Sequence, residues 1–208
     1  MKAAMMMEIY LAGPEVFLPD ADAIFEKKKA ICGDHGFKGV SPFDNEPPKR
    51  LRNLLKISGA IYRSNELAMK NCDLAIANVT PFRGISADPG TVLEIGFFLG
   101  QEKTVFAYTN VEEDYAVRVS KSAWAGGDLR QDCHGHKVEN FELFDNLMIQ
   151  HGVWESGGNV FIQSVTSNED LYRDLTGFEK AVKAAQERVQ GVGRLTAGGR
   201  IAAAGGRR

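Results

Sequence analysis

Short runs of β-branched and aromatic residues alternate along this chain with longer stretches of helical periodicity, and this alternation limits the possible folds more than any other feature. The strand-like runs span residues 8–13, 37–42, 74–79, 104–109 and 159–164, most of them bounded by Gly, Pro, Asn or Asp. The helical stretches cover about 20–35, about 53–71, about 91–102, a looser region ending in about 140–151, and about 168–190. Strands that alternate with helices form right-handed βαβ units, which build a parallel sheet covered on both faces. We therefore predict an α/β fold with a doubly wound, five-stranded parallel sheet of the flavodoxin-like kind.

The length of the chain suits one domain followed by a tail. A chain of 208 residues, of which 44% are apolar, lies within the range of a single globular domain. We place this domain at 8–190, with a last helix that opens on the acidic and capping residues at 168–170. The segment 191–208 is rich in Gly, Ala and Arg and has little large apolar surface to offset chain entropy. We expect this tail to be disordered and solvated, with a contact to an acidic partner as the alternative.

Charge and hydropathy argue against several classes of partner. The net charge of −2 gives no basic surface for a nucleic acid polymer, so we expect none. No apolar run reaches the roughly 18–20 residues that would span a bilayer, so we expect no membrane association. The start of the chain lacks the pattern of a signal peptide, and three cysteines are too few for a disulfide scaffold. These features predict reduced thiols and a cytoplasmic location.

The sequence contains no recognisable cofactor loop. AGPEVF, after the first strand-like run, lacks the G-x-G-x-x-G pattern of dinucleotide binding, and no G-x-x-x-x-G-K-[ST] loop occurs. Asp132, Cys133, His134 and His136 have side chains that can bind metals, but their spacing matches neither two C-x-x-C pairs nor an i, i+4 histidine pair. We therefore expect no cofactor and no metal, and a polar surface loop at 132–136.

The ends of the predicted strands indicate where a ligand should bind. In an open parallel sheet the ligand lies outside the carboxyl ends of the strands, so the candidate segments are 13–17, 43–46, 80–94 and the loop after Thr109. Within them Glu94 is a carboxylate among apolar neighbours near the start of a predicted helix. From spacing alone, a role in the helix dipole and a catalytic role are equally good interpretations.

Several separate segments resemble one enzyme family in order and spacing. They are EIYLAGPEVFLPD at 8–20, SPFDNE at 41–46, SNELAMKNCDLAIANVTPFRG at 64–84 and ADPGTVLEIGFFLGQEKTV at 87–105. The pattern D-x-G-T-x-x-E-[LIV]-G is the most specific, and it falls here on Asp88, Gly90, Thr91, Glu94, Ile95 and Gly96. Over about residues 8–165 the chain resembles the nucleoside 2-deoxyribosyltransferase family. The resemblance implies transfer of a 2-deoxyribosyl group from a deoxynucleoside donor to a nucleobase acceptor through a covalent deoxyribosyl-glutamate.

The resemblance also implies roles for three catalytic residues. Glu94 matches the family's nucleophile, which attacks the anomeric carbon, as a carboxylate does in retaining glycosidases. Tyr10 matches a tyrosine that hydrogen-bonds the nucleophile, and its alternative is a strand residue in the core. Asp88 matches the aspartate that holds the departing base and helps deliver its proton, and its alternative is an Asx-type cap before Pro89 and Gly90.

Position 65 departs from the commoner family pattern. Many relatives carry aspartate there, whereas this chain has Asn65 followed by Glu66. An amide can hydrogen-bond a sugar or a base but cannot act as a general acid. We expect Asn65 to bind substrate, and the proton for the leaving base to come from Asp88, Glu66 or ordered water.

Other positions are expected to complete the substrate site. Gly90 belongs to the family motif, and Phe17 and Phe82 either stack on the base or pack in the core. Asp44, Asn45 and Glu46 either contact base or sugar or form a plain turn. Asn146, in FELFDNLMI at 141–149, resembles the asparagine that reaches into the neighbouring subunit's site, with a solvent-facing helix residue as the alternative. The resemblance thus implies a homo-oligomer with shared active sites.

The sequence is also compatible with two other functions. One is a hydrolase of the N-glycosidic bond in 2′-deoxynucleosides or their 5′-monophosphates, with water in place of the second base. The other is a nucleotide-sensing module that kept the fold without turnover. The presence of Tyr10, Asp88 and Glu94 together argues against the second.

Overall fold

A sheet of five parallel strands in the order β2-β1-β3-β4-β5 forms the centre of the molecule. The structure is a computed structural model that describes residues 6–44, 52–126 and 128–197. The strands are β1 (Glu8–Ala12), β2 (Lys38–Val40), β3 (Leu74–Asn78), β4 (Val105–Thr109) and β5 (Val160–Ile162). This order is that of flavodoxin-like proteins, with the switch point between β1 and β3. The predicted fold class is confirmed.

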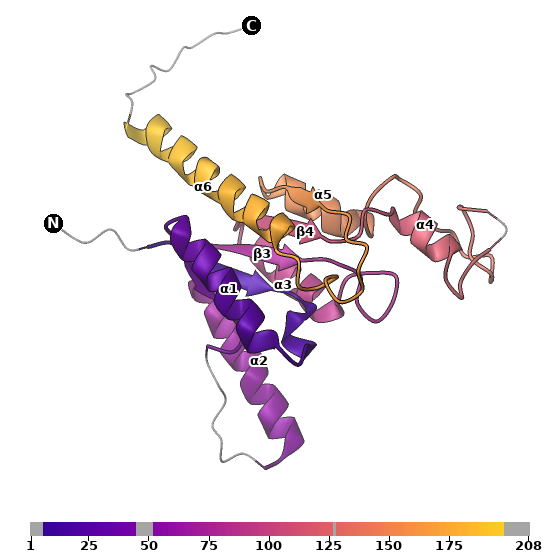
Figure 1. Cartoon of the computed structure of the whole chain (residues 1–208), viewed down its shortest axis with the longest axis horizontal. Coiled ribbons are helices and arrows are strands. Elements are labelled where there is room, and N and C mark those ends of the chain that lie inside the picture. The colour runs from indigo at the N-terminus through magenta and orange to yellow at the C-terminus, as the bar shows by residue number, and fades with distance from the viewer. Residues whose placement is uncertain (1–5, 45–51, 127, 198–208) are drawn as a thin grey trace, which may run out of the picture.

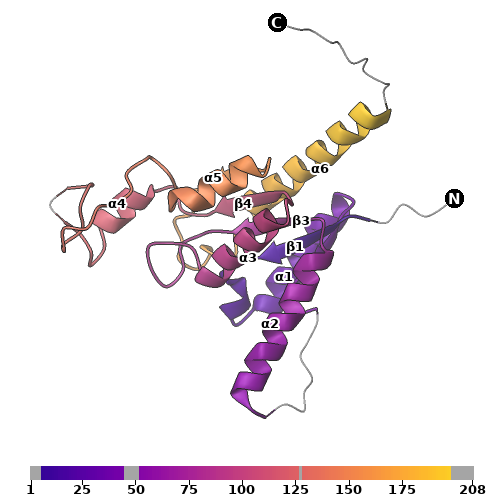
Figure 2. The same cartoon turned by 180° about the vertical axis from the view of Figure 1, so that it is seen from behind.

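Helices cover both faces of the sheet, because side chains alternate along each strand between two apolar clusters. Tyr10 and Ala12 on β1 belong to the cluster that includes residues of α2 (Leu54–Asn71), α3 (Pro89–Gly100) and α5 (Leu147–Glu155). Ile9 and Leu11 belong to the opposite cluster, with residues of α1 (Ala21–Asp34) and α6 (Thr176–Ala197). Figure 1 shows the face with α1 and α6, and Figure 2 shows the face with α2, α3 and α5.

Two short helices were not predicted from the sequence. The 3-10 helix η1 (Pro14–Phe17) follows β1 directly, and α4 (Tyr115–Ser120) follows β4 after a short loop. Helices of one or two turns show too little periodicity to be recognised in a sequence. The start of η1 matters for the site, because it turns the chain immediately after the carboxyl end of β1.

The last helix differs from the prediction at both ends. It begins at Thr176, not near residue 168. Residues 168–173 form turns, and the Asp174 side chain then accepts a hydrogen bond of 2.9 Å from the Thr176 backbone N–H. It continues to Ala197, so its last turns overlap the beginning of the segment 191–208 that was expected to be a tail. A glycine weakens a helix by only about 1 kcal/mol, and an existing helix extends at one hydrogen bond per residue. The remainder of the predicted tail, 198–208, lies outside the described residues.

Within the described ranges, no helix is both long enough and apolar enough to cross a membrane. The three cysteines are free thiols, with Cys32 and Cys72 buried and Cys133 exposed. Burial raises the pKa of both the Cys32 and the Cys72 thiol to about 12.

Candidate active site

A cavity of about 490 Å³ opens at the carboxyl ends of β1 and β2. Three segments predicted from the strand ends contribute to its wall, and α2 contributes a fourth side through Asn65, which was expected at the substrate, and Ile61, which was not. The loop after Thr109 does not line it. The cavity is lined by Gly13, Val16, Phe17, Pro42, Phe43, Ile61, Asn65, Asp88, Gly90, Thr91 and Glu94.

Glu94 and Tyr10 meet at the base of this cavity. The Tyr10 hydroxyl donates a hydrogen bond of 2.6 Å to Oε1 of Glu94. Burial raises the pKa of Glu94 to about 7, and the negative charges of Asp88 and Glu15 act in the same direction. The hydrogen bond from Tyr10 opposes this rise because it stabilises the carboxylate. Burial also raises the pKa of Tyr10, so its hydroxyl stays protonated and acts as a donor.

Asp88 lies at the N-terminus of α3 and lines the cavity. Its Oδ2 accepts a hydrogen bond of 3.1 Å from the Thr91 backbone N–H, so Asp88 caps α3. A Cβ atom on Gly90 would lie 2.9 Å from the same oxygen. Gly90 therefore leaves room for the Asp88 carboxylate beside the cavity.

Asn65 and Glu66 point in different directions from α2. Asn65 lines the cavity together with Ile61, which precedes it by about one helical turn. Glu66 forms an ion pair of 2.9 Å with Lys70 on the helix surface and does not line the cavity. Asp88 and Glu66 were the two carboxylates considered as proton donors for the base, and only Asp88 lines the cavity.

Phe17 and Phe82 stack on one another with ring centroids 5.2 Å apart and an interplanar angle of 12°. Phe17 lines the cavity, whereas Phe82 lies behind it, with Tyr172 packed against the edge of its ring. The guanidinium of Arg83 lies 4.7 Å from the Phe17 ring and 4.8 Å from the Phe82 ring. Phe82 thus supports Phe17, and Phe17 presents the aromatic surface to the cavity.

Asp44 belongs to a turn and does not line the cavity. Its side chain accepts hydrogen bonds of 2.9 Å from both the backbone N–H and the hydroxyl of Ser41, and it pairs with Lys29. These contacts support the plain-turn alternative for Asp44. Asn45 and Glu46, which were also expected at the substrate, lie outside the described residues.

Asn146 lies at the N-terminus of α5 and is absent from the cavity of its own chain. Its Oδ1 accepts a hydrogen bond of 3.0 Å from the Met148 backbone N–H, and its Nδ2 donates one of 3.0 Å to Glu139. If Asn146 binds a sugar, it does so in another subunit.

A buried carboxylate behind the cavity was missed from the sequence. Oε1 of Glu15 accepts hydrogen bonds from Lys28, from Asn78 at 2.9 Å and from Tyr108 at 2.8 Å. A Cβ atom on Gly13 would lie 2.0 Å from Oε2 of Glu15, so this close approach requires glycine. The signal in the sequence was a glutamate directly after Gly-Pro at the end of a buried strand. Glu15 fixes the turn that carries Phe17.

Within the described ranges, no group of three or more His, Cys, Asp or Glu side chains is placed to hold a metal ion. In the loop at 132–136, His136 Nδ1 lies 3.0 Å from Asp132 Oδ2, and both histidines are exposed. This loop lies outside the cavity.

A half-buried carboxylate oriented by a tyrosine at the strand ends of a doubly wound sheet is typical of an α/β enzyme that uses the carboxylate as nucleophile or base. Residues 9–148 match the family model described as nucleoside 2-deoxyribosyltransferase. The chain belongs to this family, whose members are enzymes of glycosyl transfer or glycosidic cleavage.

Three individual proteins are similar to this chain. The chain is similar to the uncharacterized protein C191.05c of Schizosaccharomyces pombe, with 31% identity over 74% of this chain and 80% of that protein. It is also similar to the solved structure of a 2-desoxiribosyltransferase from Leishmania mexicana, with 28% identity, a TM-score of 0.55, and coverage of 80% of this chain and 94% of that one. A CMP N-glycosidase of Clostridium botulinum, BcmB, matches with 14% identity, a TM-score of 0.43, and coverage of 89% and 98%. This third likeness is too distant to indicate an activity.

Proposed function

We propose that this protein transfers a 2-deoxyribosyl group from one nucleobase to another through a covalent bond between the sugar and Glu94. The observation that carries the proposal is the contact between Tyr10 and Glu94, 2.6 Å long, in a cavity of about 490 Å³. A cavity of this size suits a small organic ligand such as a nucleoside. The family uses nucleosides and nucleobases as substrates, which agrees with this choice of ligand.

The reaction consists of two displacements at the anomeric carbon. In the first, an ionised oxygen of Glu94 bonds to this carbon, and the bond to the base breaks, with its electron pair leaving on the base, which takes up a proton. In the second, a nitrogen of the incoming base attacks the same carbon, the bond to Glu94 breaks, and the incoming base loses a proton. Two displacements retain the configuration of the sugar. A 2-deoxy sugar suits this chemistry, because it lacks an electron-withdrawing hydroxyl beside the carbon that develops positive charge.

Tyr10 orients the nucleophile. Its hydrogen bond fixes one oxygen of Glu94, so the plane of the carboxylate is set before substrate binds. The same hydrogen bond keeps the carboxylate from becoming still more basic, because it favours the ionised form. A nucleophile with a pKa of about 7 is ionised in a large fraction of molecules at neutral pH, yet is more basic than an exposed glutamate.

Asp88 and Asn65 hold the departing base. Both line the cavity, but an amide has no proton to transfer as an acid, so the proton for the base comes through Asp88 or through water bound there. Phe17 supplies a flat apolar wall for the ring of the base. We assign orientation of the base to Phe17 and Asn65, and proton delivery to Asp88.

Asn146 serves the active site of a neighbouring subunit in this proposal. It is absent from the cavity of its own chain, and it lies beside Met148, whose side chain is 72% exposed. Leu93 on α3 is 62% exposed as well, although α3 carries Glu94. Large exposed apolar side chains next to a site are typical of a surface that another chain covers. These features support a homo-oligomer in which each site is completed by two chains.

The closest alternative is hydrolysis, with water replacing the second base. For 5′-monophosphates, one feature argues against this alternative. Among the lining residues in the described part of the chain, none carries a positive charge that would pair with a phosphate. An uncharged nucleoside fits this lining better.

The test compares deoxyuridine alone with deoxyuridine plus adenine, followed by chromatography of bases and sugars. We expect uracil and deoxyadenosine only when adenine is present. Free deoxyribose at the same rate in both reactions would identify a hydrolase and contradict the proposal. Binding of deoxyuridine without release of uracil under either condition would identify a sensor.

A further inference from the structure

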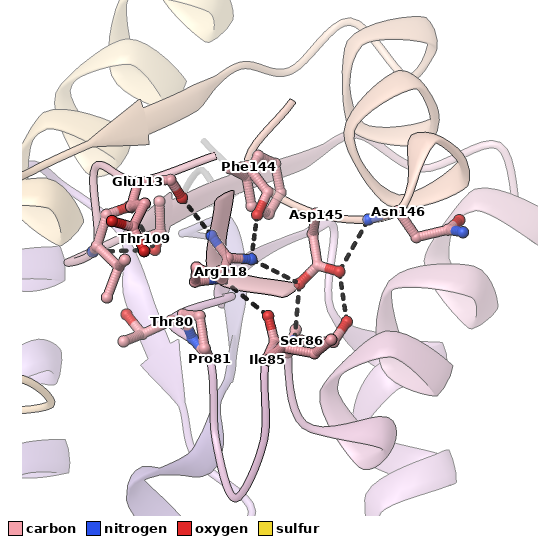
Figure 3. A network of polar contacts seen from close by, with 12 residues as sticks. Thr80, Pro81, Ile85, Ser86, Thr109, Glu113, Arg118, Phe144, Asp145 and Asn146 are labelled. Atoms are coloured by element: carbon pink, nitrogen blue, oxygen red, sulfur yellow. Dashed lines mark hydrogen bonds and ion pairs between the residues drawn. The ribbon is translucent and has the colours of Figure 1, made fainter. Parts of the chain in front are cut away.

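The buried carboxylate of Asp145 holds two separate pieces of backbone in place. Its Oδ2 accepts a hydrogen bond of 2.7 Å from the Ala87 backbone N–H, and its Oδ1 accepts one of 2.8 Å from the Asn146 backbone N–H. Oδ1 also accepts a hydrogen bond from the Ser86 hydroxyl. Figure 3 shows these contacts converging on Asp145. The side chain is only 1% exposed, so water does not compete for them.

Arg118 anchors this carboxylate and the loops around it. Its Nε donates a hydrogen bond of 2.8 Å to the Ile85 carbonyl, and its terminal nitrogens donate to the carbonyls of Glu113 and Phe144. One of these nitrogens lies 3.8 Å from Oδ2 of Asp145. Arg118 on α4 thereby ties together the loop before α3 and the loop before α5 (Figure 3). A planar guanidinium suits this task, because it offers several donors in a fixed geometry.

Of the two residues whose backbone Asp145 holds, one directly precedes a predicted site residue and the other is itself a predicted site residue. Ala87 is followed by Asp88, which caps α3 and lines the cavity of its own chain. Asn146 caps α5 and lies outside that cavity. One buried carboxylate therefore fixes the backbone beside Asp88 and the backbone of Asn146 at the same time.

We propose that Asp145, anchored by Arg118, is a positioning residue that sets both Asp88 in its own active site and Asn146 for the active site of the adjoining subunit. The proposal rests on the shared site argued above. In this arrangement neither Asp145 nor Arg118 touches substrate. Their effect on the reaction passes through the two neighbouring residues that do.

Asparagine has one acceptor oxygen and one donor nitrogen where aspartate has two acceptors, so Asp145→Asn should disturb only one of the two backbone contacts. In Asp145→Asn, the side-chain nitrogen is best placed where Oδ1 was, because the Ser86 hydroxyl can accept a hydrogen bond there. The remaining oxygen then keeps its contacts with Ala87 and Arg118, whereas the Asn146 N–H faces another donor. A buried N–H group without an acceptor costs free energy, so we expect the loop at Asn146 to move while Asp88 keeps its position.

The first experiment measures the homo-oligomer of Asp145→Asn. We expect kcat/KM for base exchange to fall by about tenfold, as for loss of one buried hydrogen bond that positions a substrate group. The matched control is Ser156→Ala, at the opposite end of α5, which removes a hydrogen bond of 3.0 Å to the Val105 N–H outside the cavity. The control should lower the melting temperature without lowering kcat/KM. An unchanged rate in Asp145→Asn, or an equal loss in both variants, would overturn the proposal.

The second experiment assigns the effect to one subunit. Glu94→Ala and Asn146→Ala chains are mixed so that restored activity comes only from sites that pair Glu94 of one chain with Asn146 of the other. Adding Asp145→Asn to the Glu94→Ala chain should lower the restored rate by about tenfold, and adding it to the Asn146→Ala chain should change the rate by less than about twofold. Equal effects in the two placements would overturn the assignment. No restored rate in the unmodified pair, with subunit exchange verified by mass, would instead refute the shared site itself.

Discussion

Tyr10 and Glu94, which are 84 positions apart in the sequence, share a hydrogen bond of 2.6 Å at the carboxyl end of β1. The contact joins the middle of the sheet to the first turns of α3, and the rest of the cavity is arranged around it.

Replacing Glu94 should abolish transfer. Glu94→Ala and the closer isostere Glu94→Gln both lack the nucleophilic oxygen, and we expect base exchange to fall by about 10³-fold or more with the fold intact. Exchange is measured by chromatography and folding by circular dichroism. More than about a tenth of the wild-type rate in a folded variant would rule out Glu94 as the nucleophile.

The rate should depend on pH through the ionisation of Glu94. Because the nucleophile must be ionised and its pKa is about 7, kcat/KM should fall as the pH drops below 7. Tyr10→Phe removes a hydrogen bond that stabilises the carboxylate, so the pKa rises and the acidic limb moves to higher pH. Profiles of the two proteins measured side by side test this. A limb that stays in place, or moves to lower pH, contradicts the assigned role of Tyr10.

Ionisation of Glu94 should also lower the free energy of unfolding as the pH rises. Its pKa is higher in the folded protein than the ordinary value of 4.5, so folding favours the protonated form, and stability falls as the pH rises from about 4.5 through about 7. Glu94→Gln is neutral throughout, and at pH 8 we expect its free energy of unfolding to exceed that of the wild type by about 1–3 kcal/mol. At pH 4 the two should agree. Denaturant titrations at both pH values measure the difference, and the same difference at both would refute the linkage.

Asn65→Asp should retain substantial activity with a changed pH profile. The variant restores the commoner family residue in a cavity that already contains Asp88 and Glu94. A third negative charge raises the pKa of Glu94 further, so the acidic limb should move to higher pH. Complete loss of activity in a folded Asn65→Asp protein would mean that the amide itself is required.

Gly13→Ala should destabilise the fold strongly. The new methyl group would lie 2.0 Å from Oε2 of Glu15 and 2.9 Å from Cβ of Asn78, and both neighbours are fully buried. We expect a loss of about 2 kcal/mol or more. Gly33→Ala on α1 is the matched control, because no atom lies within 4 Å of its new methyl group and alanine favours a helix. Equal stability of the two variants, measured by thermal unfolding, would contradict the role of Gly13.

Residues at the strand ends could be predicted from the sequence because topology alone brings them together. Tyr10 lies in β1, and Asp88 and Glu94 follow β3, the neighbouring strand, so a parallel sheet places them at one edge. The choice of Glu94 over other carboxylates came from the family motif, since spacing alone left a role in the helix dipole equally good.

Other parts of the site depend on packing that no local pattern records. Ile61 lines the cavity because α2 packs against β1 and α3, and the partners of Glu15 come from α1, β3 and β4. The contacts of Asp44 with Ser41 and Lys29, which support the plain-turn alternative, also depend on such packing. Such assignments need the relative placement of distant elements, which periodicity does not supply.

The unequal exposure of the three thiols makes the native protein suitable for site-selective labelling. Thiolates, not thiols, react with maleimides, and the raised pKa values of buried Cys32 and Cys72 keep both protonated at neutral pH. Cys133 is exposed in a loop beyond α4 and should take up a fluorophore in a single step without any engineered substitution. Because that loop follows the helix that carries Arg118, the attached dye would report optically on movement in this part of the molecule when a nucleoside binds.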